Sequence, residues 1–346
     1  MIERLLKTPL SILSLVGGLA VGAAAKGAIA RRRKLRRVDP RLRSMALAAM
    51  PPILPALVPL MRIATQKRRT APPPGVTVQE HRVVSRFGGP DIRVVALRRA
   101  NSAQTGRALL WMHGGGYLIG APEIDFRLLG RMLEMLDVTI YSVDYRLAPH
   151  SPFPAALNDA FSVLQWLIEN SPELRISPGA IAVGGNSAGG GLAAGLAQRA
   201  LDEGITLACQ ILMYPMLDDR TACLPDHEGR GELVWTPNNN RLGWRAYLGH
   251  EPGLHAIAPY AAPARRENVS RLAPAWIGVG TLDLFYPEDL RYAERLGAAG
   301  VACETAIVPD APHAFDLTNF DHPIARGFHE SMIATLDTAF AKTAST

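Results

Sequence analysis

The sequence predicts an α/β fold in which a mostly parallel, doubly wound sheet is covered by helices on both faces. From Val76 onward, short apolar stretches alternate with longer segments of helical composition, and this alternation is typical of strand–helix–strand units. The central apolar stretches are continuous, as in strands that are buried on both faces of a parallel sheet. A length of 346 residues and a hydrophobic fraction of 48% allow a substantial core.

Eight strands are expected after residue 75. The first two alternate polar and apolar residues, so we expect them to form an antiparallel edge of the sheet. The others are short apolar runs, which favours parallel central strands. The expected strands are residues 80–84, 92–97, 108–112, 139–143, 181–183, 209–213, 276–279 and 304–308.

Six helices are expected between and after these strands. Their ranges are 124–136, 154–170, 187–203, 238–248, 287–299 and 323–342. The fourth helix lies in a loop-rich polar stretch, residues 217–262, that interrupts the alternation of strands and helices. Thr236 as N-cap and Pro237 at the first helical position mark its start. We therefore expect residues 217–262 to be a helical cap inserted above the sheet of a main domain that spans 76–346.

The N-terminal residues differ from the rest of the chain in charge. The protein carries a net charge of +6 and has a pI of about 9.4. The first 70 residues hold fifteen Lys or Arg and only two acidic residues, Glu3 and Asp39, so the remaining residues carry a net charge of −7. The basic character therefore belongs to the N-terminal segment alone. Because the rest is acidic and carries no recognition motif, we expect no nucleic-acid partner.

Two apolar runs lie in the N-terminal segment 1–75, which we expect to form a cap. Residues 8–25 are uncharged and precede the basic cluster 31–37. Three interpretations of this arrangement stay open: a first helix packed on its own domain, attachment of residues 1–37 to an anionic membrane surface, and a cleaved export signal. The second run, 45–61, contains four prolines. It is therefore expected to form short helices or turns over the main domain.

Cysteine usage indicates the cellular compartment. Cys209, Cys223 and Cys303 are too few and too scattered for a disulfide framework or a metal site. We interpret them as reduced, packed thiols. This indicates a cytoplasmic location, with membrane association if the N-terminal segment binds lipid.

A nucleophile is indicated by the motif Gly185-Asn186-Ser187-Ala188-Gly189, which lies between an expected strand and an expected helix. Acyl transfer needs a serine hydroxyl exposed at a sharp strand-to-helix turn. The N-terminus of the following helix faces developing negative charge, and the two glycines let strand, turn and helix pack closely. The motif alone is common, but its position makes Ser187 the candidate nucleophile.

A second glycine-rich turn, His113-Gly114-Gly115-Gly116-Tyr117, follows another expected strand. A glycine run there frees backbone N–H groups and lets the chain approach a ligand closely, which suits an oxyanion hole. The N–H group of Ala188 would supply a further donor. We interpret His113 as a structural residue of this turn.

The candidate base and acid follow from chain order. His313 lies in the loop after the last expected strand, and Asp283 follows the strand at 276–279. An α/β-hydrolase has the order nucleophile, acid, histidine, which Ser187, Asp283 and His313 obey. Asp283 would fix the imidazole tautomer and stabilise the imidazolium. Three competing acids are less well placed, in an expected helix or too near the base. They are Glu288, Asp289 and Asp310.

Together these motifs resemble the hormone-sensitive-lipase-like group of bacterial esterases, also called family IV carboxylesterases. The matching segments are residues 113–117, 144–149 (DYRLAP), 152–156 (PFPAA), 185–190 (GNSAGG), Asp283 and 312–315 (PHAF). They follow the family order and cover about residues 76–340. Two positions depart from the family pattern: Asn186 stands where Asp or Thr is common, and His150 stands where Glu is usual.

The resemblance implies an eight-stranded α/β-hydrolase core with a helical cap. It places the oxyanion donors at Gly115, Gly116 and Ala188. It also implies a small-molecule ester as substrate, with neither cofactor nor metal. The architecture is compatible with a homodimer.

The predicted activity is that of a serine carboxylesterase acting through an acyl-enzyme. Tyr117, together with Trp244 and Tyr247 of the cap helix, is expected to bind the substrate. The apolar character of this helix and of residues 45–61 suits short- to medium-chain or aromatic esters. Two alternatives stay open: an amidase or deacetylase that uses the same triad on small amides, and a non-catalytic ligand-binding protein on this fold.

Overall fold

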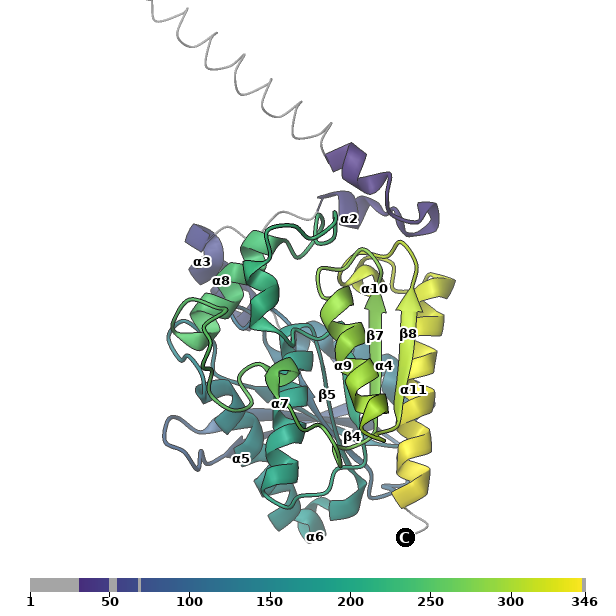
Figure 1. Ribbon diagram of the computed structural model, residues 1–346. Helices are drawn as coiled ribbons and strands as arrows, with labels where there is room; N and C mark the ends of the chain where they lie inside the picture. The colour runs from purple at the N-terminus through teal and green to yellow at the C-terminus, as the bar shows by residue number, and fades with distance from the viewer. Residues whose placement is uncertain (1–30, 50–54, 68–69, 344–346) are drawn as a thin grey trace, which may run out of the picture.

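The computed structural model describes residues 31–49, 55–67 and 70–343. In this part of the chain eight strands form one sheet with the order β1-β2-β4-β3-β5-β6-β7-β8 (Figure 1). The strands are β1 (Val76–Val83), β2 (Ile92–Arg99), β3 (Ala108–Met112), β4 (Thr139–Asp144), β5 (Ile181–Asn186), β6 (Gln210–Met213), β7 (Ala275–Gly280) and β8 (Cys303–Val308). The predicted α/β fold is confirmed, with small differences at the strand ends.

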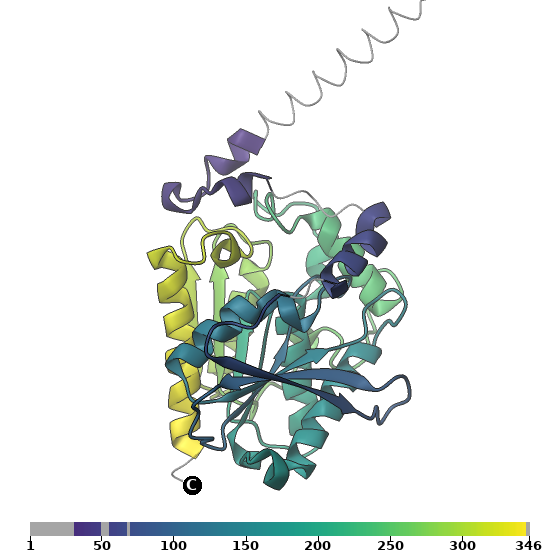
Figure 2. The ribbon, with the colours of Figure 1, turned by 180° about the vertical axis from the view of Figure 1, so that it is seen from behind.

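The sheet is antiparallel only around β2. This strand pairs antiparallel with β1 and with β4, whereas the other neighbouring strands pair parallel. The view from behind in Figure 2 shows β1 and β2 crossing the front of the molecule. Because the remaining strands are parallel, the loops that follow β3, β5, β7 and β8 lie at one end of the sheet, where ligands bind in open α/β sheets.

Helices cover both faces of the sheet. In β3, Leu110 and Met112 belong to the apolar cluster formed with α5, α7 and α9, whereas Leu109 and Trp111 belong to the cluster formed with α4 and α11. This alternation follows from the two-residue period of a strand. The main-domain helices are α4 (Phe126–Met135), α5 (Ala155–Glu169), α6 (Ser171–Leu174), α7 (Ala188–Asp202), α8 (Pro237–Leu248), α9 (Tyr286–Ala298), α10 (Phe315–Thr318) and α11 (Pro323–Thr343).

Short helices form the described N-terminal part. α2 (Met45–Ala49) and α3 (Val58–Lys67) are separate elements, as the prolines of this run predict. Both views show them over the end of the sheet at which β7 and β8 finish (Figures 1 and 2). The guanidinium of Arg62 in α3 donates to the carbonyl groups of Leu118 and Ala148. These bonds fasten α3 to the loops of the main domain.

The uncharged run at 8–25 lies outside the described residues. Residues 31–35 are helical, and the side chains of Arg32, Arg33 and Arg36 are exposed. Within the described ranges, no helix combines the length and the apolar character that crossing a bilayer requires.

Replacing Met332 by Ala should destabilise the fold, because Met332 is fully buried between α11 and the sheet. Removing a buried methionine side chain lowers the free energy of unfolding by about 2–5 kcal/mol. The matched control is Met135→Ala at the end of α4, where the side chain is 52% exposed. It should change stability by less than about 0.5 kcal/mol. Urea unfolding measures both variants, and equal losses would contradict the packing of α11 described here.

Candidate active site

Ser187 lies at the sharp turn between β5 and α7. Its backbone has φ 55° and ψ −120°, a conformation that costs a non-glycine residue about 1–3 kcal/mol. Three hydrogen bonds hold the turn: Ser187 N–H donates to the Met213 carbonyl (2.9 Å), and the N–H groups of Gly191 and Met216 donate to the Ser187 carbonyl (3.0 Å each). The strained turn presents the hydroxyl at the end of the sheet where the loops meet.

Close packing requires glycine on both sides of this turn. A Cβ atom at Gly189 would lie 2.1 Å from the carbonyl oxygen of Met112 in β3, and one at Gly185 would lie 2.5 Å from the same oxygen. Both distances are far inside van der Waals contact. Only glycine therefore lets α7 begin this close to β3, and the two glycines fix the position of Ser187 relative to the turn after β3.

His313 lies between Ser187 and Asp283 at hydrogen-bond distance from each. Its Nε2 is 2.9 Å from Ser187 Oγ, and its Nδ1 is 2.6 Å from Asp283 Oδ2. The other carboxylate oxygen of Asp283 accepts a bond from the Phe285 N–H (3.0 Å). An ionised carboxylate only accepts, so Nδ1 carries the proton and the Nε2 lone pair faces the serine hydroxyl. This is the geometry in which a histidine can act as general base.

Aromatic rings surround the imidazole of His313. Tyr214 and Phe285 contact it edge-on, with ring centroids at 4.8 Å and 5.3 Å. The exposed fractions are only 7% for Ser187, 4% for His313 and 0% for Asp283. Electrostatic interactions are stronger in such a water-poor site than in solvent, and the rings restrict the imidazole to one orientation.

The turn after β3 presents backbone amides beside the Ser187 turn. Gly115 and Gly116 have φ values of 120° and 62°, which glycine adopts readily. Among the described residues, neither amide donates to a protein acceptor. Ala188 is the first residue of α7, so its amide belongs to the positive end of that helix. This arrangement fits the oxyanion donors that the resemblance implies.

The imidazole of His113 supports this turn from inside. It is fully buried, its Nδ1 lies 2.8 Å from the Gly114 carbonyl oxygen, and its ring stacks on Tyr145 with centroids 4.3 Å apart. Burial lowers the pKa of His113 to about 4, so the ring is neutral at pH 7. These contacts give His113 the structural role expected from the sequence.

A buried carboxylate that the sequence did not single out lies under the nucleophile turn. Asp125 accepts hydrogen bonds from Trp111 Nε1 (2.8 Å) and from Asn186 Nδ2 (3.0 Å). Burial raises the pKa of Asp125 to about 6, although both bonds oppose the shift. An amide suits position 186 because it donates to Asp125, where a second carboxylate would add like-charge repulsion.

Tyr117, Trp244 and Tyr247 pack against one another. The rings of Tyr117 and Tyr247 stack with centroids 3.8 Å apart, and Trp244 lies 5.9 Å from Tyr117. None of the three is more than 2% exposed, and their binding of the substrate stays a prediction. The indole beside the site is Trp235, with its ring centroid 6.4 Å from that of His313. The sequence carries no signal for this ring beyond its place just before the cap helix.

Comparison with known proteins identifies the family to which this geometry belongs. The profile of a family described as alpha/beta hydrolase fold matches residues 109–317. The chain belongs to the α/β-hydrolase family. The matched range includes the turn after β3, the nucleophile turn, and the loops that carry Asp283 and His313.

Two relatives of this α/β-hydrolase are named as esterases. The esterase LipI of Mycobacterium tuberculosis is 34% identical over 209 residues, which is 60% of this chain and 65% of LipI. The carboxylesterase NlhH of the same organism is 33% identical over 214 residues, 60% of this chain and 66% of NlhH. The chain thus spans just under two thirds of the length of these two relatives.

A solved structure is similar over a longer range. The structure of a bacterial heroin esterase matches with a TM-score of 0.81 and 30% identity, covering 88% of this chain and 99% of that protein. With the family profile and the two mycobacterial relatives, this likeness confirms the resemblance to the hormone-sensitive-lipase-like esterases.

His113→Gln should make stability less dependent on pH in the acidic range. The unfolded chain binds a proton at His113 near pH 6.5, whereas the folded protein binds it only near pH 4. The stability that neutral His113 contributes is therefore present above pH 6.5 and is lost as the pH falls toward 4, by about 3 kcal/mol at most. Urea unfolding at about pH 7.5 and about pH 4.5 measures this effect. The difference between variant and wild type should shrink on acidification, and a constant difference would count against a neutral, buried His113.

Proposed function

We propose that this protein is a serine carboxylesterase that hydrolyses short- to medium-chain carboxylic esters through an acyl-enzyme intermediate. The observation that carries the proposal is the hydrogen-bonded series from Ser187 through His313 to Asp283, beside the amides of Gly115 and Gly116. In this proposal one site supplies a nucleophile, a base, an acid and oxyanion donors. The names of LipI, NlhH and the heroin esterase support the ester class.

In the first half-reaction His313 Nε2 accepts the Ser187 proton while Oγ attacks the ester carbonyl carbon. The carbonyl oxygen becomes an oxyanion, which the amides of Gly115, Gly116 and Ala188 stabilise. The tetrahedral intermediate expels the alcohol, which takes the proton from Nε2 and leaves an acyl group on Oγ. Water then attacks the acyl-enzyme and gives a proton to Nε2. The carboxylic acid departs as Oγ regains its proton.

In this mechanism Asp283 stabilises the positively charged form of His313 inside the protein. The imidazolium that forms in each half-reaction lies 2.6 Å from the Asp283 carboxylate. Asp283 has no exposed surface and also accepts the Phe285 amide, so its orientation is fixed before the substrate arrives. The reaction uses only side chains, backbone amides and water.

Amide hydrolysis by the same residues is the second candidate. An activated amide presents the same carbonyl to Ser187, but its amine must be protonated by His313 as it leaves. The relatives' names favour esters. A purely ligand-binding role is disfavoured, because it requires neither a base nor an acid. Here His313 lies 2.9 Å from the Ser187 hydroxyl and 2.6 Å from the Asp283 carboxylate.

Ser187→Ala should lower the hydrolysis of p-nitrophenyl acetate and butyrate by about 10³-fold or more, because the acyl acceptor is removed. The matched control is Ser142→Ala, a fully buried serine in β4 whose hydroxyl has no hydrogen-bond partner among the described residues. It should keep wild-type kcat/KM. Assay of the corresponding p-nitroanilides compares esters with amides. Wild-type protein that is inert on the esters but cleaves the anilides would overturn the ester assignment.

We propose further that the N-terminal part contacts an anionic membrane surface. Leu57, Leu60 and Ile63 follow one another at three-residue spacing and are 45%, 64% and 50% exposed. Met45 in α2 is 84% exposed. An exposed apolar helix face next to a basic cluster is the combination that binds anionic lipid. The exposed arginines of residues 31–37 supply that cluster.

The position of this surface supports a role in substrate access. α2 and α3 lie at the end of the molecule to which the loops after β7 and β8 belong (Figures 1 and 2). Contact with lipid through these helices would therefore bring the end that carries Asp283 and His313 toward the membrane. Esters dissolved in the bilayer would then lie near the site.

Co-sedimentation with lipid vesicles tests this contact. The full chain should bind vesicles of phosphatidylcholine with added phosphatidylglycerol at low salt, and binding should weaken at high salt. Leu60→Ser combined with Ile63→Ser should weaken partitioning by about tenfold or more, because two apolar side chains are lost from the contact. The control is Met135→Ser, with 52% exposure at the end of α4. Binding that does not depend on phosphatidylglycerol or on salt concentration would refute the proposal, as would equal binding by all variants.

A further inference from the structure

The indole of Trp235 lies directly on the turn that carries the candidate oxyanion donors. A Cβ atom at Gly116 would be 2.1 Å from Cη2 of Trp235, and one at Gly243 would be 3.3 Å from Cζ2. The residue is only 4% exposed. Trp235 therefore closes one side of the space in which the carbonyl of an ester would lie.

The position of the indole indicates which part of an ester it meets. A carbonyl carbon attacked by Ser187 has its oxygen directed at the amides of Gly115 and Gly116, and its leaving oxygen directed at His313 Nε2. The third substituent of that carbon is the acyl chain. Trp235 packs on Gly116, whereas its centroid is 6.4 Å from the imidazole. The ring thus lies against the oxyanion turn and farther from the imidazole that faces the leaving group.

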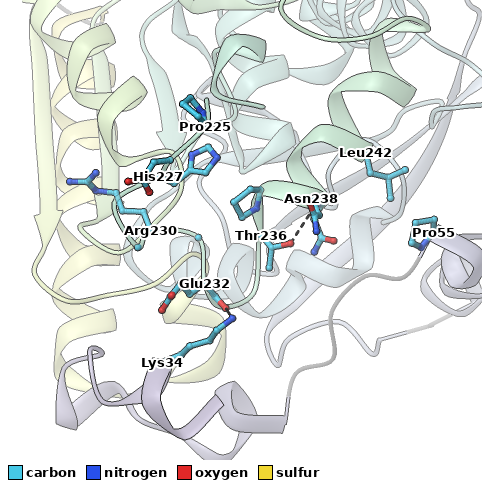
Figure 3. Close-up of a pocket in the computed structure, with 14 residues that line it drawn as sticks. Lys34, Pro55, Pro225, His227, Arg230, Glu232, Thr236, Asn238 and Leu242 are labelled. Carbon is cyan, nitrogen blue, oxygen red and sulfur yellow. Dashed lines mark hydrogen bonds between the residues drawn. The ribbon is translucent and has the colours of Figure 1, made fainter. Parts of the chain in front are cut away.

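A pocket of about 720 Å³ lies beside the loop that carries Trp235, and its lining includes Glu232 and Thr236 (Figure 3). Its walls come from three parts of the chain: Lys34 and Pro55 of the N-terminal part, the loop at 225–232, and the beginning of α8. Figure 3 shows Pro55 and Leu242 on one side, with His227 and Arg230 on the other. A volume of this size accommodates a small organic ligand.

We propose that Trp235 sets the upper limit of acyl-chain length by separating the oxyanion turn from this pocket. Short acyl groups fit in front of the indole, whereas longer chains need the volume behind it. This inference rests on the proposed esterase activity and adds the residue that determines which esters are accepted.

The surroundings of Trp235 allow its side chain to be shortened. Among the described residues, the Trp235 side chain makes one hydrogen bond, from Nε1 to Asn240 Oδ1. Its length of 3.3 Å is long for such a bond. Val234 has φ 62° and Gly231 has φ 67°, so the segment is an irregular loop until α8 begins at Pro237. A smaller residue at 235 removes packing from this loop and from the edge of the apolar cluster to which Trp235 belongs, outside the strands of the sheet.

The experiment compares p-nitrophenyl acetate, butyrate and decanoate, which differ only in the acyl chain. In Trp235→Ala, the ratio of kcat/KM for decanoate to kcat/KM for acetate should rise by about tenfold or more relative to wild type, because methylenes gain a pocket. Trp235→Phe should give a smaller rise. The matched control is Trp166→Ala, a partly buried tryptophan whose ring contacts His81 and Tyr141. It should keep the wild-type ratio.

The outcomes separate this inference from the proposed function. An unchanged ratio in Trp235→Ala that still hydrolyses acetate overturns the inference and leaves the esterase function standing. If that variant does not fold, an unchanged ratio in Trp235→Phe overturns it equally. A rise of the same size in Trp166→Ala does so too, because the effect would then be unspecific. Wild-type protein inert on all three esters, or full activity in Ser187→Ala, overturns the esterase function itself.

Discussion

The arrangement of the site depends on the close approach of α7 to β3. At Gly189 any side chain would overlap the carbonyl oxygen of Met112, and the tight connection forces Ser187 into a positive φ. As a result, the amide of Ala188 and the glycine turn after β3 border the same small space. Stabilisation of an oxyanion depends on donors that are already in place, and displacement by about 1 Å reduces it strongly. The constraint is steric, so it positions the groups before any substrate binds.

The two departures from the family pattern have local partners that explain them. Asn186 donates to the buried Asp125, which also accepts from Trp111. His150 has its Nδ1 2.8 Å from Nη1 of Arg62, and a neutral imidazole nitrogen accepts from a guanidinium as a carboxylate does. In both places the substituted side chain completes a hydrogen bond to its neighbour.

Local patterns were sufficient for the sheet and for the order of the catalytic candidates. Strands that are buried on both faces form continuous apolar runs, and chain order alone selected Asp283 and His313 as partners for Ser187, which the structure places within hydrogen-bond distance. The packing of the expected cap could not be predicted in the same way. Trp235 meets Gly116 across more than a hundred residues of sequence, through a loop without periodicity. Composition identified apolar side chains in the cap but not which of them pack against each other and which face the site.

The candidate catalytic residues and the candidate specificity residue, Trp235, lie in differently built parts of the molecule. The candidate triad is carried by the segments that lead from β5, β7 and β8 into the next helices, whereas Trp235 follows an irregular loop that the N-terminal part contacts. Arg37 donates to the carbonyl of Gly229 (2.8 Å) and lies 3.7 Å from the Glu232 carboxylate, while Lys34 donates to the Glu232 carbonyl (3.4 Å). An anionic surface that attracts Lys34 and Arg37 would compete for these side chains with the carbonyl and carboxylate groups of the loop. If both proposals hold, lipid contact and acyl selection would be coupled through the loop that ends at Trp235, because Lys34 and Arg37 belong to the basic cluster and also bind this loop.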